Sequence, residues 1–380
     1  MNRNALDLLP ALYRAALAAV DPERAVRSAL ARPEVALAIQ NARRVAVFAV
    51  GKAAAGMFRA AWKPGRKALV VLPKGYAAPR ARGVRVHFSS HPEPDASSVL
   101  AARAAVLFFS AFGPGDLILC LVSGGASSLV CLPRDGVTLA AKKRAVARLV
   151  RTGAPIEDVN RLRTSLSAVK GGKLGRETRA GLVTLVLSDV PGDRASLVGS
   201  GPTVRGRRGD VTRIVASNRD GLAGAAREGR RRGLDVRISR RRGSGEARDA
   251  GLSLARAAKR LAPGAVLLAG GETTVSLGRA RGVGGRSLEL ALAAAIALEG
   301  TSNVAILAAG SDGRDGSSRA AGARVDGSTA ERARRRGRDP ARALARHDSE
   351  PCLEAAGALL VTGPTGTNVA DWAFAVRYGV

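Results

Sequence analysis

Short apolar runs alternate along the chain with longer stretches in which apolar residues recur every three or four positions. The runs end at glycine or polar residues and have the length of strands that are buried on both faces. We predict strands at residues 45–50, 68–72, 84–88, 117–123, 182–188, 211–216, 236–239, 265–269, 304–309 and 358–361. The longer stretches predict helices at residues 96–112, 139–151, 218–232, 250–261 and 288–298, and helices that begin at residues 52 and 155.

The order of these elements indicates an α/β fold. Strand–helix–strand alternation in the first half predicts a doubly wound, mostly parallel sheet, and the second half repeats the pattern. A chain of 380 residues is too long for one small core. We therefore predict an N-terminal domain at residues 1–235 and a C-terminal α/β domain at residues 236–380.

The composition excludes several classes of protein. Hydrophobic residues make up 46% and charged residues 24%, as in ordinary globular proteins rather than disordered or collagen-like chains. No apolar run is long enough for a transmembrane helix, and the N-terminal stretch contains acidic residues and a proline, unlike a signal peptide. The three cysteines lack CxxC spacing, which is typical of reduced thiols, so we expect a cytoplasmic protein without a membrane partner.

The charge is unusual, because 61 basic and 31 acidic residues leave a formal net charge of +30. The basic residues crowd into residues 227–242 and 332–346, where no aromatic residues are interleaved for base stacking. We favour an arginine-rich composition with few surface carboxylates over a specific nucleic-acid partner. Weak, salt-sensitive binding to polyanions is expected in either case.

The loops after the predicted strands carry the candidate chemistry, because ligands of doubly wound sheets bind beyond the carboxyl ends of the strands. These loops cover residues 51–52, 123–128, 188–193, 270–274, 310–313 and 363–368. They hold glycines and hydroxyls that suit anions, carboxylates that suit Mg²⁺, and one lysine that could neutralise phosphoryl charge. Together they favour phosphoryl transfer, although each loop alone is equally consistent with a simple turn.

Established phosphate and hydrolase motifs are missing from the sequence. It contains no GxxxxGK[ST], no complete GxGxxG, no protein-kinase HRD and DFG pair, and no GxSxG. Lys52 and Arg286 lie at the starts of predicted helices, where a positive charge opposes the helix dipole, so a functional role is favoured. The aspartates of the same loops have a structural alternative, because they could cap helices.

Ten segments in unbroken order resemble the class II glycerate 2-kinases, the family with a Rossmann-like N-terminal domain and a MOFRL C-terminal domain. They are AVGKAAAGM (49–57), SHPEPD (90–95), LVSGGASSL (121–129), AVKGGKL (168–174), LSDVPGD (187–193), SGPTV (200–204), LAGGETTVSLG (268–278), GSDGRDG (310–316), AAGA (320–323) and GPTGTN (363–368).

The resemblance implies ATP-dependent phosphorylation of D-glycerate at its 2-hydroxyl, in a cleft between two α/β domains, with Mg²⁺. It implies catalytic roles for Lys52 and Asp189. The implied substrate-binding residues are Ser123, Gly124, Gly125, Ser127, Ser128, Asp193 and Arg286. The implied nucleotide-binding residues are Gly271, Glu272, Thr273, Asp312, Gly363, Thr365, Gly366, Thr367 and Asn368. The implied metal ligands are Asp189, Glu272 and Asp312. The assembly could be a monomer or a homodimer.

The chain departs from the family pattern at three of these motifs. Thr164 and Ser165 stand where the family has Lys and His, Ser287 and Leu288 replace Asn and Gln, and Arg319 replaces an acidic residue. Two alternatives to a glycerate 2-kinase therefore stay open. One is a catalytically weak or inactive paralogue whose basic surface binds polyanions, and the other is a kinase for a different small hydroxy acid.

Overall fold

The chain divides into two units in the computed structural model, which describes residues 3–152, 156–241, 243–278 and 282–379. The parallel-sheet unit comprises Asp21–Ser217, and the mixed-sheet unit comprises Met1–Val20 together with Asn218–Val380. The division therefore falls between Ser217 and Asn218 instead of between residues 235 and 236, and the N-terminal helix belongs with the C-terminal half.

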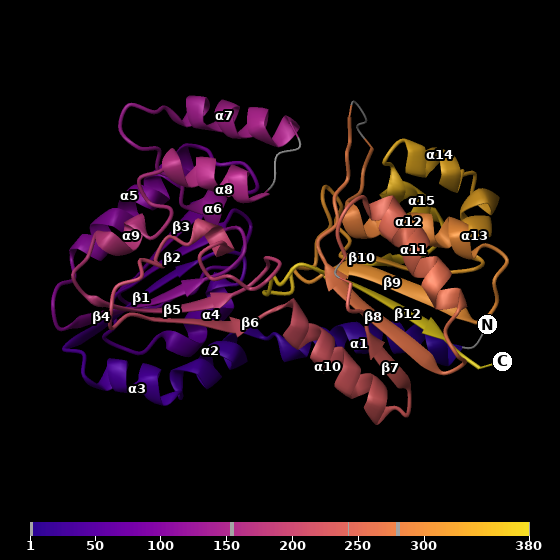
Figure 1. Ribbon diagram of the computed structural model, residues 1–380, viewed down its shortest axis with the longest axis horizontal. Coiled ribbons are helices and arrows are strands. Elements are labelled where there is room, and N and C mark those ends of the chain that lie inside the picture. The colour runs from indigo at the N-terminus through magenta and orange to yellow at the C-terminus, as the bar shows by residue number, and fades with distance from the viewer. Residues whose placement is uncertain (1–2, 153–155, 242, 279–281, 380) are drawn as a thin grey trace. The chain divides into compact units, whose positions relative to one another are not determined.

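The parallel-sheet unit is built on six strands that are all parallel, in the order β3-β2-β1-β4-β5-β6 (Figure 1). The strands are β1 (Arg44–Val50), β2 (Ala68–Pro73), β3 (Val84–Ser89), β4 (Asp116–Val122), β5 (Gly181–Leu187) and β6 (Val211–Ala216). This order is that of a doubly wound dinucleotide-binding sheet, whose direction of winding reverses between β1 and β4. The predicted fold class is confirmed.

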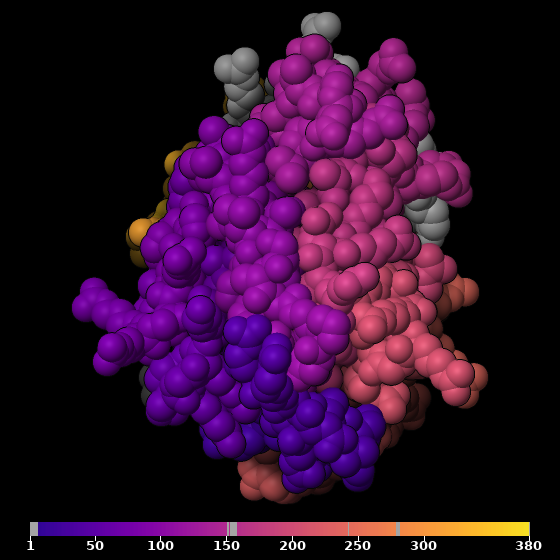
Figure 2. Space-filling view, turned by 90° about the vertical axis from the view of Figure 1, so that its left-hand side faces the viewer, coloured from indigo at the N-terminus to yellow at the C-terminus, as the bar shows by residue number. Residues whose placement is uncertain are grey.

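Helices cover both faces of this sheet, with α2 and α3 on one side and α5 and α9 on the other (Figure 1). The helices are α2 (Pro22–Leu30), α3 (Pro33–Gln40), α4 (Ala54–Ala61), α5 (Ala96–Ser110), α6 (Ala126–Leu129), α7 (Leu139–Arg151), α8 (Ile156–Ser165) and α9 (Lys173–Arg176). The predicted start of a helix at residue 155 lies outside the described residues. Figure 2 shows the outer surface of this unit, where its indigo and violet part borders its magenta and pink part.

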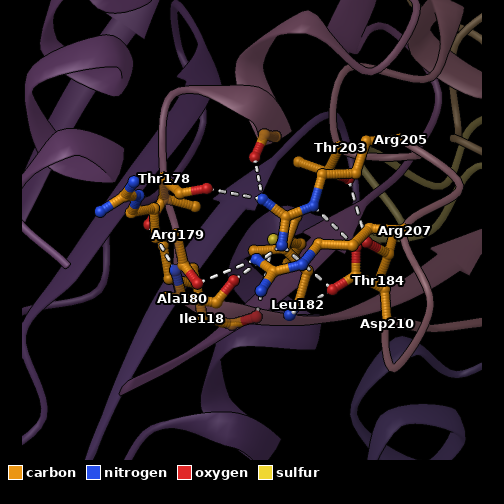
Figure 3. A network of polar contacts seen from close by, with 12 residues as sticks. Ile118, Thr178, Arg179, Ala180, Leu182, Thr184, Thr203, Arg205, Arg207 and Asp210 are labelled. Atoms are coloured by element: carbon orange, nitrogen blue, oxygen red, sulfur yellow. Dashed lines mark hydrogen bonds and ion pairs between the residues drawn. The ribbon is translucent and has the colours of Figure 1, made fainter. Parts of the chain in front are cut away.

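A buried ion pair fixes the end of the parallel sheet (Figure 3). Arg205 Nε lies 2.7 Å from Asp210 Oδ2, and the two side chains are 4% and 10% exposed. The same guanidinium donates hydrogen bonds to the carbonyl oxygens of Thr178 and Ala180, both at 2.7 Å. Because its donors are all hydrogen-bonded, this arginine anchors the segment after residue 204 to the residues just before β5, as buried charges require.

The mixed-sheet unit also has six strands, in the order β11-β10-β9-β12-β8-β7. They are β7 (Asp235–Ile238), β8 (Ala265–Gly271), β9 (Val304–Gly310), β10 (Gly322–Asp326), β11 (Leu359–Leu360) and β12 (Asp371–Arg377). The prediction that residues 358–361 form the last strand is wrong, because β12 follows and lies antiparallel between β8 and β9. β10 was not predicted either. Trp372, Phe374 and Val376 of β12 are fully or almost fully buried.

Seven helices are described in this unit, with α1 and α10 on one face of the sheet and α11 to α15 on the other (Figure 1). They are α1 (Arg3–Ala19), α10 (Asn218–Arg231), α11 (Ala247–Lys259), α12 (Arg286–Leu298), α13 (Thr329–Arg335), α14 (Pro340–Ala345) and α15 (Ser349–Ala355). Tyr13 of α1 donates a hydrogen bond of 2.7 Å to the carbonyl oxygen of Gly310, at the end of β9. None of the described helices is long and apolar enough to cross a membrane.

Candidate active site

Three of the predicted loops follow neighbouring strands of the parallel sheet. β1, β4 and β5 are adjacent and parallel, so their carboxyl ends lie at one edge of the sheet. Lys52 follows β1, residues 123–128 follow β4, and Asp189 follows β5. Both Lys52 and Asp189 are half-buried. The loops after β1 and β4 flank the point where the winding reverses, which is where such sheets bind their ligands.

The loops after β1 and β4 are locked together by backbone contacts. The Lys52 N–H donates a hydrogen bond of 2.9 Å to the Gly124 carbonyl oxygen. The Ser123 hydroxyl accepts a hydrogen bond from the Ala53 N–H at 3.1 Å and is fully buried. At Gly51 (φ +122°), a Cβ atom would lie 2.1 Å from Ser123 Oγ, so only glycine fits this approach. Ser123 thus has a structural task beside the role predicted for it.

The side chains of Lys52 and His91 both lie close to Gly125. A Cβ atom at Gly125 (φ +87°) would lie 3.1 Å from His91 Cδ2 and 3.5 Å from Lys52 Cγ. The aliphatic part of the Lys52 side chain therefore lies against the loop that follows β4 (residues 123–128, the β4 loop), where it could contact a ligand bound at that loop. His91 belongs to the SHPEPD segment, one of the ten segments that carry the family resemblance.

Lys170 is a residue of this site that the sequence analysis did not single out. Its side chain is 3% exposed, and its ammonium donates hydrogen bonds to the Ser127 carbonyl oxygen (2.6 Å) and to the Ser127 hydroxyl. Burial lowers the pKa of Lys170 to about 7, with the neighbouring charges of Lys142 and Arg163 acting in the same direction. The only signal in the sequence was its place inside the AVKGGKL segment.

Other hydroxyls and carboxylates of these loops stabilise the loops themselves. Ser128 Oγ donates to the Gly125 carbonyl oxygen at 3.0 Å. The Ser188 hydroxyl donates to Asp193 Oδ1 at 2.8 Å, and Asp193 has a left-handed backbone (φ +52°). Asp193 therefore closes its own turn and caps no helix. Its predicted role in binding substrate stays a prediction.

A pocket of about 510 Å³ opens within this unit beside the β4 loop. It is lined by Asn160, Arg161, Thr164, Ser165, Lys173, Arg194, Ser196, Leu197 and Ser200. Ser200 Oγ lies 3.3 Å from Ser127 Oγ, which joins the pocket to the hydroxyl that Lys170 contacts. We call it the basic pocket.

In the mixed-sheet unit, predicted residues from separate loops gather around Arg286, the first residue of α12. Arg286 Nη1 forms an ion pair with Glu272, and Nη2 lies 3.1 Å from Asp371 Oδ2. Glu272 follows β8, whereas Asp371 begins β12 opposite both Gly271 and Gly310. Arg286, predicted to bind substrate, is thus already paired with carboxylates of its own unit.

Two aspartates of this cluster, Asp315 and Asp371, were not predicted. Asp315 is 3% exposed and accepts a hydrogen bond of 2.7 Å from the Leu288 N–H at the start of α12. Burial raises the pKa of Asp315 to about 6 and that of Asp371 to about 7, while Arg286 lowers both. We call Arg286 with Glu272, Asp312, Asp315 and Asp371 the acidic cluster.

The C-terminal GPTGTN loop lies against the loop that follows β9. The Thr365 N–H donates to the Asp312 carbonyl oxygen at 3.2 Å, and the Thr367 hydroxyl donates to the Val20 carbonyl oxygen at 3.0 Å. Thr367 and Asn368 are buried, as is Thr273, whereas Gly366 is exposed. The structure therefore joins two of the three predicted nucleotide loops, and the buried side chains contribute to packing.

The donor set agrees better with a metal ion carried by a nucleotide than with a resident one. Among the residues that the structure describes, no three His, Cys, Asp or Glu side chains form a group able to hold a metal ion. Glu272 and Asp312 belong to the mixed-sheet unit and Asp189 to the parallel-sheet unit, so the predicted set of three is divided between them. Mg²⁺ needs only one or two carboxylates when phosphates supply its other ligands.

Some arginines of the two basic stretches pair with carboxylates. Arg231 at the end of α10 and Arg232 just after it both pair with Glu228, and Arg334 of α13 pairs with Glu299. Such pairs reduce the field that a polyanion would meet at these arginines.

Comparisons with known proteins identify the family. A family model described as "Domain of unknown function (DUF4147)" matches residues 8–221, and the model of the MOFRL family matches residues 265–371. A D-glycerate 2-kinase from Thermotoga maritima is 36% identical over 405 residues, which cover 95% of each chain. A crystal structure of glycerate kinase from the same organism matches with a TM-score of 0.84 and 33% identity, covering 99% of this chain and all of that one.

The chain belongs to the glycerate kinase family. The resemblance stated from the ten segments is confirmed, and so is the two-domain α/β fold that it implied. Two relatives, both from Agrobacterium vitis, carry a different, provisional name, hydroxypyruvate reductase. One of them is 37% identical over 417 residues, or 97% of this chain and 93% of that one. Within this family member, the structure brings Lys52 beside Gly124 and Gly125, and brings Arg286 beside Glu272.

Proposed function

We propose that this chain is a glycerate 2-kinase, which transfers the terminal phosphoryl group of ATP to the 2-hydroxyl of D-glycerate and yields 2-phosphoglycerate and ADP. One observation carries the proposal: Lys52 and Asp189 follow strands that flank β4, whose glycine-rich loop is fixed against the Lys52 backbone. A lysine, a carboxylate and an anion-binding loop at one sheet edge are the groups that phosphoryl transfer needs.

Each group has a defined task in the proposed reaction. The 2-hydroxyl oxygen bonds to the γ-phosphorus, and the bond from that phosphorus to the β,γ-bridging oxygen breaks. Asp189 accepts the hydroxyl proton, and the Lys52 ammonium neutralises charge on the transferred group. Glu272 and Asp312 are the residues that would hold Mg²⁺ with the nucleotide phosphates, where the ion would neutralise phosphate charge.

An ADP-release assay with D-glycerate, ATP and Mg²⁺ tests this function. Removal of a group that stabilises transition-state charge costs about 10²–10³ in kcat, so Lys52→Ala should lose at least that. Asp189→Asn should lose about 10²–10⁴. Lys63→Ala, which changes an exposed lysine beyond the end of α4, is the matched control. Turnover that survives in both site variants contradicts the site, and a phosphorus NMR spectrum that shows a 3-phosphate contradicts the regiochemistry.

The name hydroxypyruvate reductase suggests a competing activity that the same preparation can test. Reduction would require a nicotinamide dinucleotide, and the chain has no complete GxGxxG after a strand. We therefore expect no NADH oxidation with hydroxypyruvate under conditions in which ADP is released with D-glycerate.

A second candidate function is a kinase for a different small hydroxy acid. It is favoured by Thr164 and Ser165, two of the positions that depart from the family pattern, because both line the basic pocket beside the β4 loop. A panel of hydroxy acids in the same assay decides between the two, since the true acceptor will have the highest kcat/KM.

A further inference from the structure

The basic pocket has the composition of an anion site. Of its nine lining residues, Arg161, Lys173 and Arg194 are cationic, five have neutral hydrogen-bonding side chains, one is leucine, and none is a carboxylate. A pocket with several hydrogen-bond donors and no carboxylate matches an oxyanion in both charge and hydrogen bonding.

The positive charge in this pocket is only partly compensated. Arg161 pairs with Asp158 at 2.7 Å, outside the pocket. Lys173 Nζ donates to the carbonyl oxygens of Thr164 (3.1 Å) and Ser167 (2.5 Å), which orient the ammonium without neutralising it. Arg194 is exposed and has no ion pair with any residue that the structure describes. At least two unit charges therefore remain for a ligand.

Further cations lie around the pocket. Lys170 reaches Ser127, whose hydroxyl is 3.3 Å from that of Ser200 on the pocket wall. Lys142 is 4% exposed, and its ammonium has no hydrogen bond within the described part of the chain. Burial lowers the pKa of Lys142, and the charge of Lys173 on the pocket wall acts in the same direction. Buried cations without carboxylates repel one another and cost folding free energy, so their presence around one pocket indicates an anion that offsets the repulsion.

The backbone at the pocket wall is held in an unusual shape. Gly199, Ser200 and Gly201 all have positive φ values (+58°, +61° and +54°). The Ser200 carbonyl oxygen accepts a hydrogen bond of 2.9 Å from the Gly171 N–H, one residue after Lys170. A left-handed serine is strained, and such strain is concentrated at sites where a side chain must be aimed. Here the turn aims the Ser200 hydroxyl at Ser127.

We propose that the basic pocket binds a small oxyanion, either the carboxylate of the acceptor acid or a phosphate group. Binding of the oxyanion stands independently of the proposed kinase activity, whereas its assignment to the acceptor's carboxylate rests on that activity. Arg194 supplies the charged contact, and the hydroxyls of Thr164 and Ser165 set which acids fit.

Calorimetric titration of the full chain with inorganic phosphate and with D-glycerate tests the pocket. Loss of one charge-assisted hydrogen bond should raise the dissociation constant of the pocket's ligand about tenfold or more in Arg194→Gln. Arg103→Gln, which changes an exposed arginine on α5 away from the pocket, should leave it unchanged. Equal affinities in these two variants, or no binding of either probe, would overturn the proposal.

Competition between the probes distinguishes the sources of the oxyanion. If D-glycerate displaces phosphate from the wild-type chain but not from Arg194→Gln, the pocket holds the acceptor's carboxylate. If both bind at once and only phosphate depends on Arg194, the pocket is a separate phosphate site. Arg194-dependent binding without ADP release would uphold the pocket and contradict the kinase. Normal turnover in Arg194→Gln, with unchanged KM for D-glycerate and unchanged phosphate binding, would uphold the kinase activity and contradict the anion-binding pocket.

Discussion

The two units carry opposite charges at their candidate sites. In the parallel-sheet unit, the buried cations Lys142 and Lys170 have no carboxylate partner among the described residues, whereas in the mixed-sheet unit Arg286 pairs with the carboxylates of Glu272 and Asp371. Burial acts against charge in both places, so it lowers the pKa of Lys170 to about 7 and raises that of Asp371 to about 7. The proposed reaction would use the first unit for an anionic acid and the second for a metal–nucleotide complex.

The largest expected effect is a dependence of stability on pH that differs in sign between the two units. The pKa of Lys170 is lower in the folded chain than its ordinary value of 10.5. Between pH 7 and 9 the unfolded chain then binds more protons, so this lysine makes the free energy of unfolding rise with pH. The slope is at most about 1.4 kcal/mol per pH unit for one proton.

Urea unfolding at pH 7 and pH 9 measures this slope. Lys170→Met keeps most of the side-chain volume and should remove the rise, while the exposed Lys63→Met should keep it. An identical rise in all three proteins would mean that Lys170 carries its charge at neutral pH.

The acidic cluster should show the opposite slope. The folded pKa values of Asp371 (about 7) and Asp315 (about 6) lie above the ordinary 3.8, so the folded chain binds more protons between pH 4 and 7. Their contribution to stability is therefore lost as pH rises through this range. Asp371→Asn should flatten the fall in the free energy of unfolding between pH 5 and 7. A fall of unchanged steepness would contradict the raised pKa.

Removal of Arg286 should have a somewhat smaller effect, about 2 kcal/mol of stability at pH 7, since its partners are only partly buried. Arg286→Ala leaves Asp371 and Glu272 near each other without a cation. Adding Asp371→Ala should restore part of the loss, because the repelling charge is gone. Urea unfolding of both single variants and the double variant gives the coupling free energy between Arg286 and Asp371. If the two single losses simply add in the double variant, the expected coupling is contradicted.

The same comparison shows what could be predicted from the sequence. β1, β4 and β5 were predicted because strands buried on both faces are continuous apolar runs, and their loops could be read for chemistry at once. β12 was missed because its large residues alternate with alanines and its first and last residues are charged. Its place depends on antiparallel partners far away in the chain, β8 and β9.

Lys170 and Asp371 were missed for a related reason. Nothing local marks a lysine or an aspartate as buried, because burial results from the packing of distant elements. Lys170 donates a hydrogen bond to Ser127, and Asp371 pairs with Arg286 at the start of α12. Both residues therefore come to their sites only when the chain folds. The division into units also differs from the predicted domain bounds, since α1 packs on α10 in the mixed-sheet unit. The order of the motifs, in contrast, can be read from the sequence without knowledge of the fold, and it identified the family.

The smallest predicted effect tests the division of tasks between the two units, through the KM values for ATP and D-glycerate. Tyr13→Phe removes the hydrogen bond to the Gly310 carbonyl oxygen and should cost about 1 kcal/mol. Tyr378→Phe, which has no hydrogen bond from its hydroxyl among the described residues, should cost less. Because Gly310 precedes Asp312, Tyr13→Phe should raise the KM for ATP and leave the KM for D-glycerate unchanged. If the KM for D-glycerate rises instead, the acidic cluster serves the acceptor acid, and the division of tasks between the two units is wrong.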